Sequence, residues 1–279
     1  MIELTAGAAA VRVDPEDGGR LTSLRVGDAE LLGAGGAGPA GLDRIMYGSF
    51  LMAPFVGRLE GARFTFAGRE WTVPANLAPH ALHGLVFDRP WTVDGTATLG
   101  AAVGAAIGIE LDGRWPFGGA VRQEFELTPD ALTVRATVTN ERRAMPAIVG
   151  FHPWFARRID GGPELAYRFE PGLRYVCDED GIPRHLSAST GPRPWDDSFT
   201  AVASPPVLRW PTFDLTVASA AGHWIVCETK ADAVCVEPLS GPVNGLNTDH
   251  YQIVEPGAPL RFSMTLHWTA RQPTDRKTT

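Results

Sequence analysis

Short alternations of apolar and polar residues, separated by turn residues, recur along almost the whole chain and constrain its fold. Around Thr128-Pro129-Asp130, two such alternating runs face each other within residues 104–140. A third runs from Leu260 to Trp268. A period of two predicts strands with one buried face, and the proline-containing interruption predicts the turn of an antiparallel hairpin. No long amphipathic helix pattern accompanies them, so we expect an all-β, mainly antiparallel chain built as a large β-sandwich.

The length and apolar content indicate one domain. The chain has 279 residues, of which 44% are hydrophobic, and β domains of this size often stay single. We therefore expect one β-sandwich domain over residues 1–270, followed by a polar tail over residues 271–279 that is disordered. The glycine- and alanine-rich residues 33–41 predict a mobile loop.

Charge and cysteine usage exclude several classes of partner. The formal net charge is −7 and no dense run of Lys or Arg is present, which argues against nucleic acid. No apolar segment is long enough to span a membrane. Cys177, Cys227 and Cys235 lack the short paired spacing of a zinc site or a disulfide framework. We expect a cytoplasmic protein that binds a small molecule.

Two ionisable residues each follow a buried apolar run and precede a proline. His152 follows residues 147–151 and precedes Pro153, while Glu237 follows residues 233–236 and precedes Pro238. Because proline cannot donate a ladder hydrogen bond, we expect both side chains to lie where a strand gives way to a loop. Rigidly held groups of this kind suit proton transfer. The alternative for His152 is an ordinary edge histidine.

Further polar candidates lie near apolar runs. Arg58 follows Gly57 and offers a fork of donors for sugar hydroxyls or a carboxylate, or else a structural salt bridge. His80 and His83 are three residues apart, so we expect one to point into a pocket and the other outward. Asp196 and its neighbour Asp197 lie between aromatic residues, where acidic pairs are usually solvated.

These stretches together resemble the aldose 1-epimerase (mutarotase) family. The resemblance runs in order through Pro54-Phe55-Val56-Gly57-Arg58, Phe64 to Gly68, His80 to Gly84, Trp115-Pro116-Phe117, the hairpin ending at Asn140, His152-Pro153-Trp154-Phe155, Trp195 to Phe199, and Glu237-Pro238. It implies a supersandwich of antiparallel sheets with a sugar in an open cleft. It also implies an isomerase that needs neither cofactor nor metal. We expect a monomer or a homodimer.

The resemblance assigns roles to individual residues. By similarity, His152 is the general acid, Glu237 the general base and His83 a second active-site histidine. Arg58 contacts sugar hydroxyls, and Asp196 matches the substrate-binding aspartate better than Asp197 does. Independently of the resemblance, Trp154 or Phe155 offers a ring to stack on the apolar face of the sugar; the alternative is that either side chain fills the core.

Mutarotation opens a cyclic hemiacetal and closes it on the other face. A base takes the proton of the anomeric hydroxyl while an acid protonates the ring oxygen. We expect His152 and Glu237 to face each other across a groove with a pyranose-sized gap. Because a neighbouring carboxylate would raise the pKa of His152, we also expect this histidine to be charged.

Departures from galactose-type members leave the sugar undefined. They are Gly57, Leu85, Trp154 and Pro238-Leu239. One alternative is a hexose-6-phosphate 1-epimerase, with Arg20, Arg58 and Arg89 as possible phosphate ligands. Another is a non-catalytic sugar-binding or sensing module, which would not need both His152 and Glu237. A third is a metal-dependent enzyme that uses His80, His83, His152 and Glu237.

Overall fold

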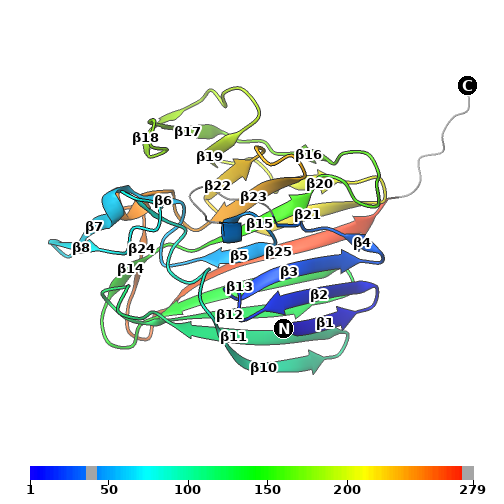
Figure 1. Cartoon of the computed structure of the whole chain (residues 1–279), viewed down its shortest axis with the longest axis horizontal. Helices are drawn as coiled ribbons and strands as arrows, with labels where there is room; N and C mark the ends of the chain where they lie inside the picture. The colour runs from blue at the N-terminus through cyan, green and yellow to red at the C-terminus, as the bar shows by residue number, and fades with distance from the viewer. Residues whose placement is uncertain (36–42, 272–279) are drawn as a thin grey trace, which may run out of the picture.

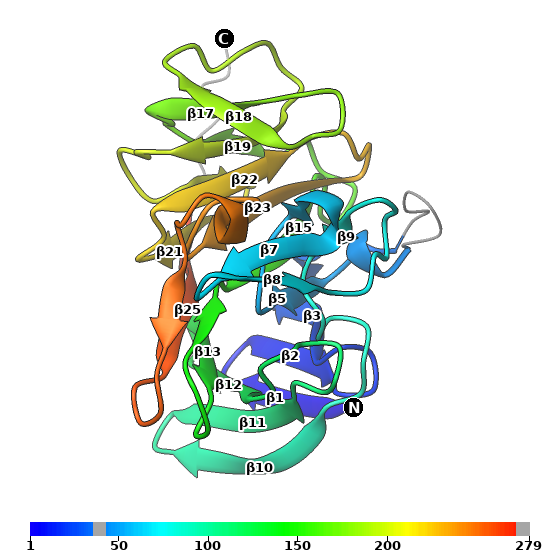
Figure 2. The ribbon, with the colours of Figure 1, turned by 90° about the vertical axis from the view of Figure 1, so that its left-hand side faces the viewer.

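Two antiparallel sheets pack face to face and form a β-sandwich (Figures 1 and 2). The computed structural model describes residues 1–35 and 43–271. The expected all-β architecture is confirmed. Most of the loop predicted over residues 33–41, and the tail predicted after residue 271, lie outside the described residues.

One sheet has eleven strands and carries the central candidates. In spatial order its strands are β1 (Ile2–Ala6), β2 (Ala9–Asp14), β3 (Arg20–Val26), β5 (Ser49–Met52), β15 (Gly150–Ala156), β23 (Ala233–Leu239), β22 (His223–Cys227), β19 (Asp196–Thr200), β17 (Leu173–Cys177) and β18 (Pro183–Ser187), with β4 (Ala29–Glu30) beside β3. The β17–β18 hairpin projects at the top of Figure 1.

The second sheet has eight strands and contains both alternating runs of the predicted hairpin. Its order is β10 (Thr92–Leu99), β11 (Ala102–Glu110), β12 (Ala120–Leu127), β13 (Ala131–Thr139), β25 (Leu260–Ala270), β21 (Phe213–Ser219), β20 (Val207–Arg209) and β16 (Ala166–Arg168). Three short pairs lie outside the main sheets: β14 (Met145–Ala147) with β24 (Gln252–Val254), β6 (Arg58–Leu59) with β9 (Ala81–Leu82), and β7 (Arg63–Phe66) with β8 (Arg69–Thr72). Single 3-10 turns are η2 (Asp43–Ile45), η3 (Glu60–Ala62) and η4 (Gly245–Asn247).

Strand alternation decides which side chains enter the core. Phe151 of β15 stacks on Phe262 of β25 with ring centroids 5.8 Å apart, which joins the two sheets. In β23, Val234 and Val236 belong to the same core. Because successive side chains point to opposite faces, His152 and Glu237 lie on the outer face of the eleven-stranded sheet.

The prolines do not end the strands, and this part of the sequence interpretation was wrong. His152 lies inside β15 and Glu237 inside β23. Gly150 pairs with Leu239 and Trp154 with Cys235, while the ladder between these pairs is interrupted. Pro153 and Pro238 lack the N–H groups that would complete it. The constant register therefore brings His152 opposite Glu237.

Candidate active site

A cavity of about 290 Å³ opens on the outer face of the eleven-stranded sheet and gathers the candidate residues. Strands β15, β19, β22 and β23 form its floor, and the β6–β9 pair forms one wall. Six side chains that the sequence pointed to line it: Arg58, His83, His152, Trp154, Asp196 and Glu237. These residues are far apart in the chain, so only the sheet order brings them together.

His152 and Glu237 form the centre of the cavity floor. Nε2 of His152 lies 3.3 Å from Oε1 of Glu237, and the two side chains are 5% and 2% exposed. The expected pyranose-sized gap between them is therefore wrong. The two groups are direct neighbours, because adjacent antiparallel strands place opposing residues only about 4.5–5.5 Å apart at the backbone.

Three side chains besides Glu237 contact the imidazole of His152: two rings and one thiol, which lies beside Nδ1. Phe50 stacks on it at a centroid distance of 4.4 Å, and the ring of His83 meets it at 5.0 Å with an interplanar angle of 87°. Sγ of Cys235 lies 3.1 Å from Nδ1. The sequence interpretation missed Phe50 and Cys235. Cys235 precedes Glu237 by two residues, and this spacing alone places both on one face of a strand.

Burial moves the pKa values of the central pair towards each other. Desolvation lowers the pKa of His152 well below 6.5, and the neighbouring His83 lowers it further. Desolvation raises the pKa of Glu237 well above 4.5. The expectation that the carboxylate makes His152 cationic is therefore not met in the sugar-free protein, because the loss of hydration outweighs the neighbouring charge.

The two early histidines have different surroundings. His83 lines the cavity with a left-handed backbone (φ 59°), and its buried Nδ1 has no hydrogen-bond partner among the described residues. Burial, followed by the charge of Arg58, lowers its pKa to about 3. His80 instead accepts a hydrogen bond from the backbone N–H of Gly61 at 3.1 Å. His80 is buried. The prediction that one of the two histidines would point outward was therefore wrong.

Arg58 is available for a ligand. It lies on β6, and within residues 1–35 and 43–271 its guanidinium forms no hydrogen bond or ion pair, so the alternative of a structural salt bridge is not realised. The preceding Gly57 has φ 56°, and a Cβ there would lie 2.6 Å from a methyl carbon of Val243. A glycine at this position lets the chain pass Val243 and turn Arg58 into the cavity.

The two acidic neighbours on β19 are not equivalent. Asp197 forms an ion pair with Arg174 at 3.3 Å. Asp196 is exposed, lines the cavity and has no ion-pair partner in the described parts of the chain. Its charge also contributes to the raised pKa of Glu237. Asp196 is therefore the carboxylate that is free to meet a ligand, in agreement with its choice over Asp197.

Trp154 forms part of the cavity wall. Its Nε1 donates a hydrogen bond to the carbonyl oxygen of Ile45 at 2.7 Å, and the residue is 2% exposed. This bond fixes the indole against η2. Stacking of the indole on a sugar stays a prediction.

Three side chains of this site have the chemistry of metal ligands. One donor atom each from His152, Cys235 and Glu237 lies within 4.8 Å of the others. This set differs from the four residues considered from the sequence, because it lacks His80 and His83 and contains Cys235. Burial raises the pKa of Cys235 well above 9, so ligation there would require removal of the thiol proton.

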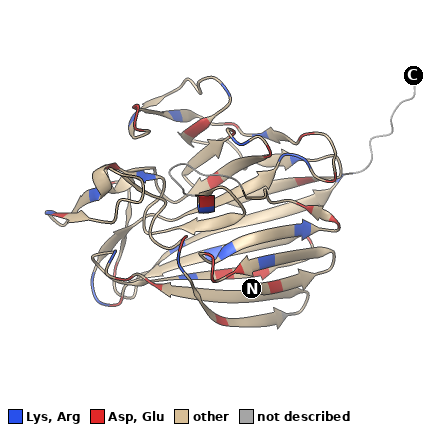
Figure 3. Ribbon diagram, viewed as in Figure 1, with Lys and Arg blue, Asp and Glu red and all other residues tan. Residues whose placement is uncertain are grey.

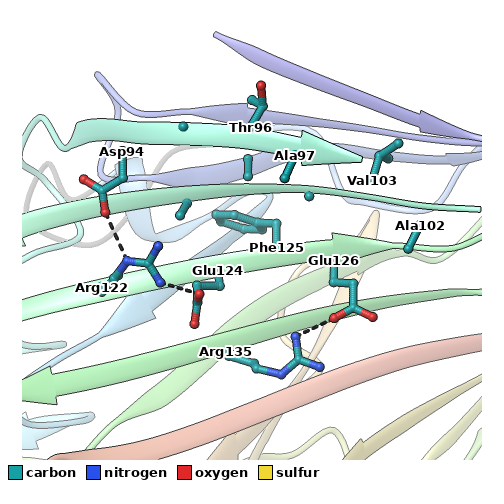
Figure 4. A pocket seen from close by; sticks show the side chains of 14 residues that line it. Asp94, Thr96, Ala97, Ala102, Val103, Arg122, Glu124, Phe125, Glu126 and Arg135 are labelled. Atoms are coloured by element: carbon teal, nitrogen blue, oxygen red, sulfur yellow. Dashed lines mark hydrogen bonds and ion pairs between the residues drawn. The ribbon is translucent and has the colours of Figure 1, made fainter. Parts of the chain in front are cut away.

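A larger concavity of about 500 Å³ lies over β10 to β13 (Figure 4). It is lined largely by glycine and alanine, and its charged side chains are paired. Arg122 binds Asp94 at 3.1 Å, and Arg135 binds Glu126 at 2.8 Å. No histidine or cysteine lines it.

Acidic and basic residues are interspersed over the strands and loops in the view of Figure 3. Among the described residues, no helix has the length and hydropathy needed to traverse a bilayer.

Comparisons with known proteins agree with the fold and the motifs. The family model for aldose 1-epimerase matches residues 1–186. The protein YphB of Escherichia coli K12 is 31% identical over 109 residues, which cover 38% of this chain and 36% of YphB.

Solved structures match over nearly the whole length. A galactose mutarotase-like protein from Clostridium acetobutylicum has a TM-score of 0.86 at 14% identity, with 96% of this chain and 95% of that one covered. Galactose 1-epimerase from Lactobacillus acidophilus NCFM has a TM-score of 0.79 at 12% identity, with 96% and 93% covered. At these identities the structures establish the fold alone. The family match, which extends over most of the chain, shows that this protein belongs to the aldose 1-epimerase family.

Proposed function

We propose that the protein interconverts the α and β anomers of an unphosphorylated aldose, with His152 as general acid and Glu237 as general base. The observation that carries this proposal is the 3.3 Å contact between Nε2 and Oε1 at the floor of a cavity. Ligand pockets usually measure about 300–1,000 Å³. A cavity of about 290 Å³ suits a monosaccharide.

The closeness of the pair suits the chemistry of a hemiacetal. The anomeric hydroxyl and the ring oxygen are bonded to the same carbon, so the base and the acid must act within a few ångströms of each other. A pyranose-sized separation would place one of them out of reach. Neighbouring residues on adjacent strands supply the required spacing on a rigid support.

The opposite pKa shifts of His152 and Glu237 favour both proton transfers. A carboxylate with a raised pKa is a stronger base, and an imidazolium with a lowered pKa is a stronger acid. When Nε2 protonates the ring oxygen and Glu237 takes the hydroxyl proton, the pair has exchanged protonation states. Closure on either face then uses protonated Glu237 as the acid and neutral His152 as the base, which restores the starting protonation states of the pair.

The other cavity side chains supply binding groups. Arg58 and Asp196 offer an unpaired donor fork and an unpaired acceptor for sugar hydroxyls. His83 stays neutral above about pH 3 and can exchange a hydrogen bond through its unpartnered Nδ1. Trp154 offers an apolar wall.

The charge of the cavity favours a neutral sugar over a sugar phosphate. Arg58 is the one Lys or Arg among the lining residues, which also include Asp196, Asp197 and Glu237. Arg20 and Arg89, considered above as phosphate ligands, do not line the cavity. Arg20 is fully buried and bound to Asp17, and Arg89 is paired with Asp112.

A non-catalytic sugar-binding module is the second candidate on this fold. Such a module would gain affinity from Arg58 and Asp196 but would have no use for a buried acid and base in mutual contact. Burying two ionisable groups costs stability, so their presence favours catalysis.

Pure α and β anomers of several aldoses, and of their 6-phosphates, provide the test. Their equilibration would be followed by NMR or polarimetry with and without the protein. We expect faster equilibration of at least one free aldose and little effect on phosphates. Binding of a free aldose without faster equilibration would favour the sensing module.

The three cysteines are free, and Cys177 is exposed. Exposed thiols persist in a reducing compartment. We therefore infer that the enzyme acts in the cytoplasm.

A further inference from the structure

We propose that Cys235 is a positioning residue for the acid–base pair. In this arrangement its sulfur accepts a hydrogen bond from Nδ1–H of His152, and its S–H donates to Glu237. Nε2 then remains the one ring nitrogen that exchanges a proton with the substrate. The expected effect of Cys235 on turnover rests on the proposed function. The expected tautomer of His152 does not depend on it.

The strand register places the thiol where this role requires it. Cys235 pairs with Trp154, two residues from His152 along β15. The same two-residue step separates Cys235 from Glu237 along β23, on one face of the strand. Sγ therefore approaches His152 diagonally and meets Nδ1, while Glu237 meets Nε2 from directly opposite.

The contacts of Cys235 are specific to this pair. Its side chain is fully buried, and Sγ lies 3.1 Å from Nδ1. A carboxylate oxygen of Glu237 lies within 4.8 Å of Sγ, so the thiol proton can point towards it. Cys227, its partner on β22, instead contacts Oγ1 of Thr229 at 3.2 Å. Cys235 is thus the described cysteine that bridges both members of the pair.

The direction of these hydrogen bonds follows from which of the three side chains carry a proton. Burial raises the pKa of Cys235, so the thiol keeps its proton. Burial also raises the pKa of Glu237, so its carboxyl group keeps a proton that faces Nε2, and its other oxygen accepts the S–H. The sulfur then has a lone pair for Nδ1–H. The neutral ring then has its lone pair on Nε2, where it can receive a proton from Glu237. If S–H instead donated to Nδ1, the neutral ring would carry its proton on Nε2. Nε2 could then not accept a proton from Glu237.

Nitrogen-15 NMR of histidine-labelled, sugar-free protein tests the tautomer without any assumption about activity. We expect neutral His152 to carry its proton on Nδ1 in the wild type and in Cys235→Ser, which keeps both a donor and an acceptor. Cys235→Ala should show a mixture or the Nε2–H form. Cys227→Ala, which removes a neighbouring thiol without a contact to His152, should keep the wild-type tautomer.

Kinetics supply the second readout. Cys235→Ala should lower kcat by about 10- to 100-fold with little change in KM, as loss of a group that orients a catalytic side chain does. Cys235→Ser should restore most of kcat.

An Nε2–H tautomer in the wild type, or an unchanged tautomer in Cys235→Ala, would overturn the proposal. The wild-type spectrum decides even if the alanine variant does not fold. A wild type with the Nδ1–H tautomer but no epimerase activity would refute the proposed function alone.

Discussion

Nε2 of His152 lies 3.3 Å from Oε1 of Glu237 because two antiparallel strands, β15 and β23, place these residues opposite each other. The ladder is interrupted there by a proline beside each residue, Pro153 and Pro238. The two prolines lack the backbone N–H groups that would form ladder hydrogen bonds at this point. The strand pairing on both sides of the break keeps the two side chains in contact. The site is therefore a local break inside a sheet and not a loop at its edge.

Removal of the base should abolish most catalysis without loss of the fold. Glu237→Gln keeps the shape of the side chain but cannot accept a proton. We expect a fall in kcat of about 10²–10⁴-fold, the usual contribution of general acid or base catalysis. Polarimetry at saturating sugar measures it. His152→Ala should give a loss of similar size, and wild-type turnover in purified Glu237→Gln would rule out the assignment of the base.

The double variant adds a check on cooperation. Since the two residues act as a unit, His152→Ala with Glu237→Gln should be about as slow as either single variant. A loss equal to the product of the two single losses would indicate independent roles.

Acid should destabilise the protein through His83. Its pKa is about 3 in the folded protein against an ordinary value of 6.5. Below pH 6.5 the unfolded state therefore binds more protons, and stability falls as the pH falls. His83→Asn tolerates the left-handed backbone and does not titrate. The free energy of unfolding of the wild type, relative to this variant, should drop by about 1.4 kcal/mol per pH unit between pH 6 and pH 4.

Urea unfolding at several pH values measures this difference. Both proteins share the remaining titratable groups. Burial, the main cause of the lowered pKa of His152, stays in the variant, whereas the smaller contribution of His83 to that pKa is lost. A difference in unfolding free energy that does not change with pH would contradict the buried, neutral state of His83.

Arg58 should contribute to sugar binding and little to stability. Within the described residues it has no ion pair or hydrogen bond to lose. Arg58→Ala should raise KM about tenfold or more, the value expected for one charged hydrogen bond, and leave the melting temperature nearly unchanged. Arg58→Lys should restore part of the affinity because it keeps the charge without the fork. A large fall in melting temperature with KM unchanged would assign Arg58 a structural role instead.

Gly57→Ala should destabilise the wall of the cavity. Alanine there meets both the left-handed φ of 56° and a methyl carbon of Val243 at 2.6 Å. Together these should lower the free energy of unfolding by about 2–4 kcal/mol. Chemical denaturation measures the change.

A second substitution separates the two causes. Val243→Ala combined with Gly57→Ala should recover the packing part of the loss but not the backbone part. Full additivity of the two single effects would show that the methyl contact is not the origin of the strain.

The sequence predicted the fold class well but described residues 156–220 poorly. The alternation in residues 104–140 and 260–268 is local information, and it correctly indicated β12, β13 and β25. In residues 156–220 the local patterns indicate loops and two short strands, near residues 165–169 and 174–177. These two are present, but four more, β18 to β21, lie in the same region. Such short strands are stabilised by neighbours from other parts of the chain, so their local patterns are weak.

The sequence by itself determined which residue types were available: an imidazole and a carboxylate on buried strands, an arginine after a glycine, and an acidic pair between aromatic residues. Only the tertiary structure decided that His152 touches Glu237, that Cys235 touches His152 and that Asp197 forms an ion pair with Arg174. The physical reason is that strand pairing joins residues far apart in the chain, and burial then sets their pKa values. Neither the register between distant strands nor the loss of hydration is encoded in the spacing of any single motif.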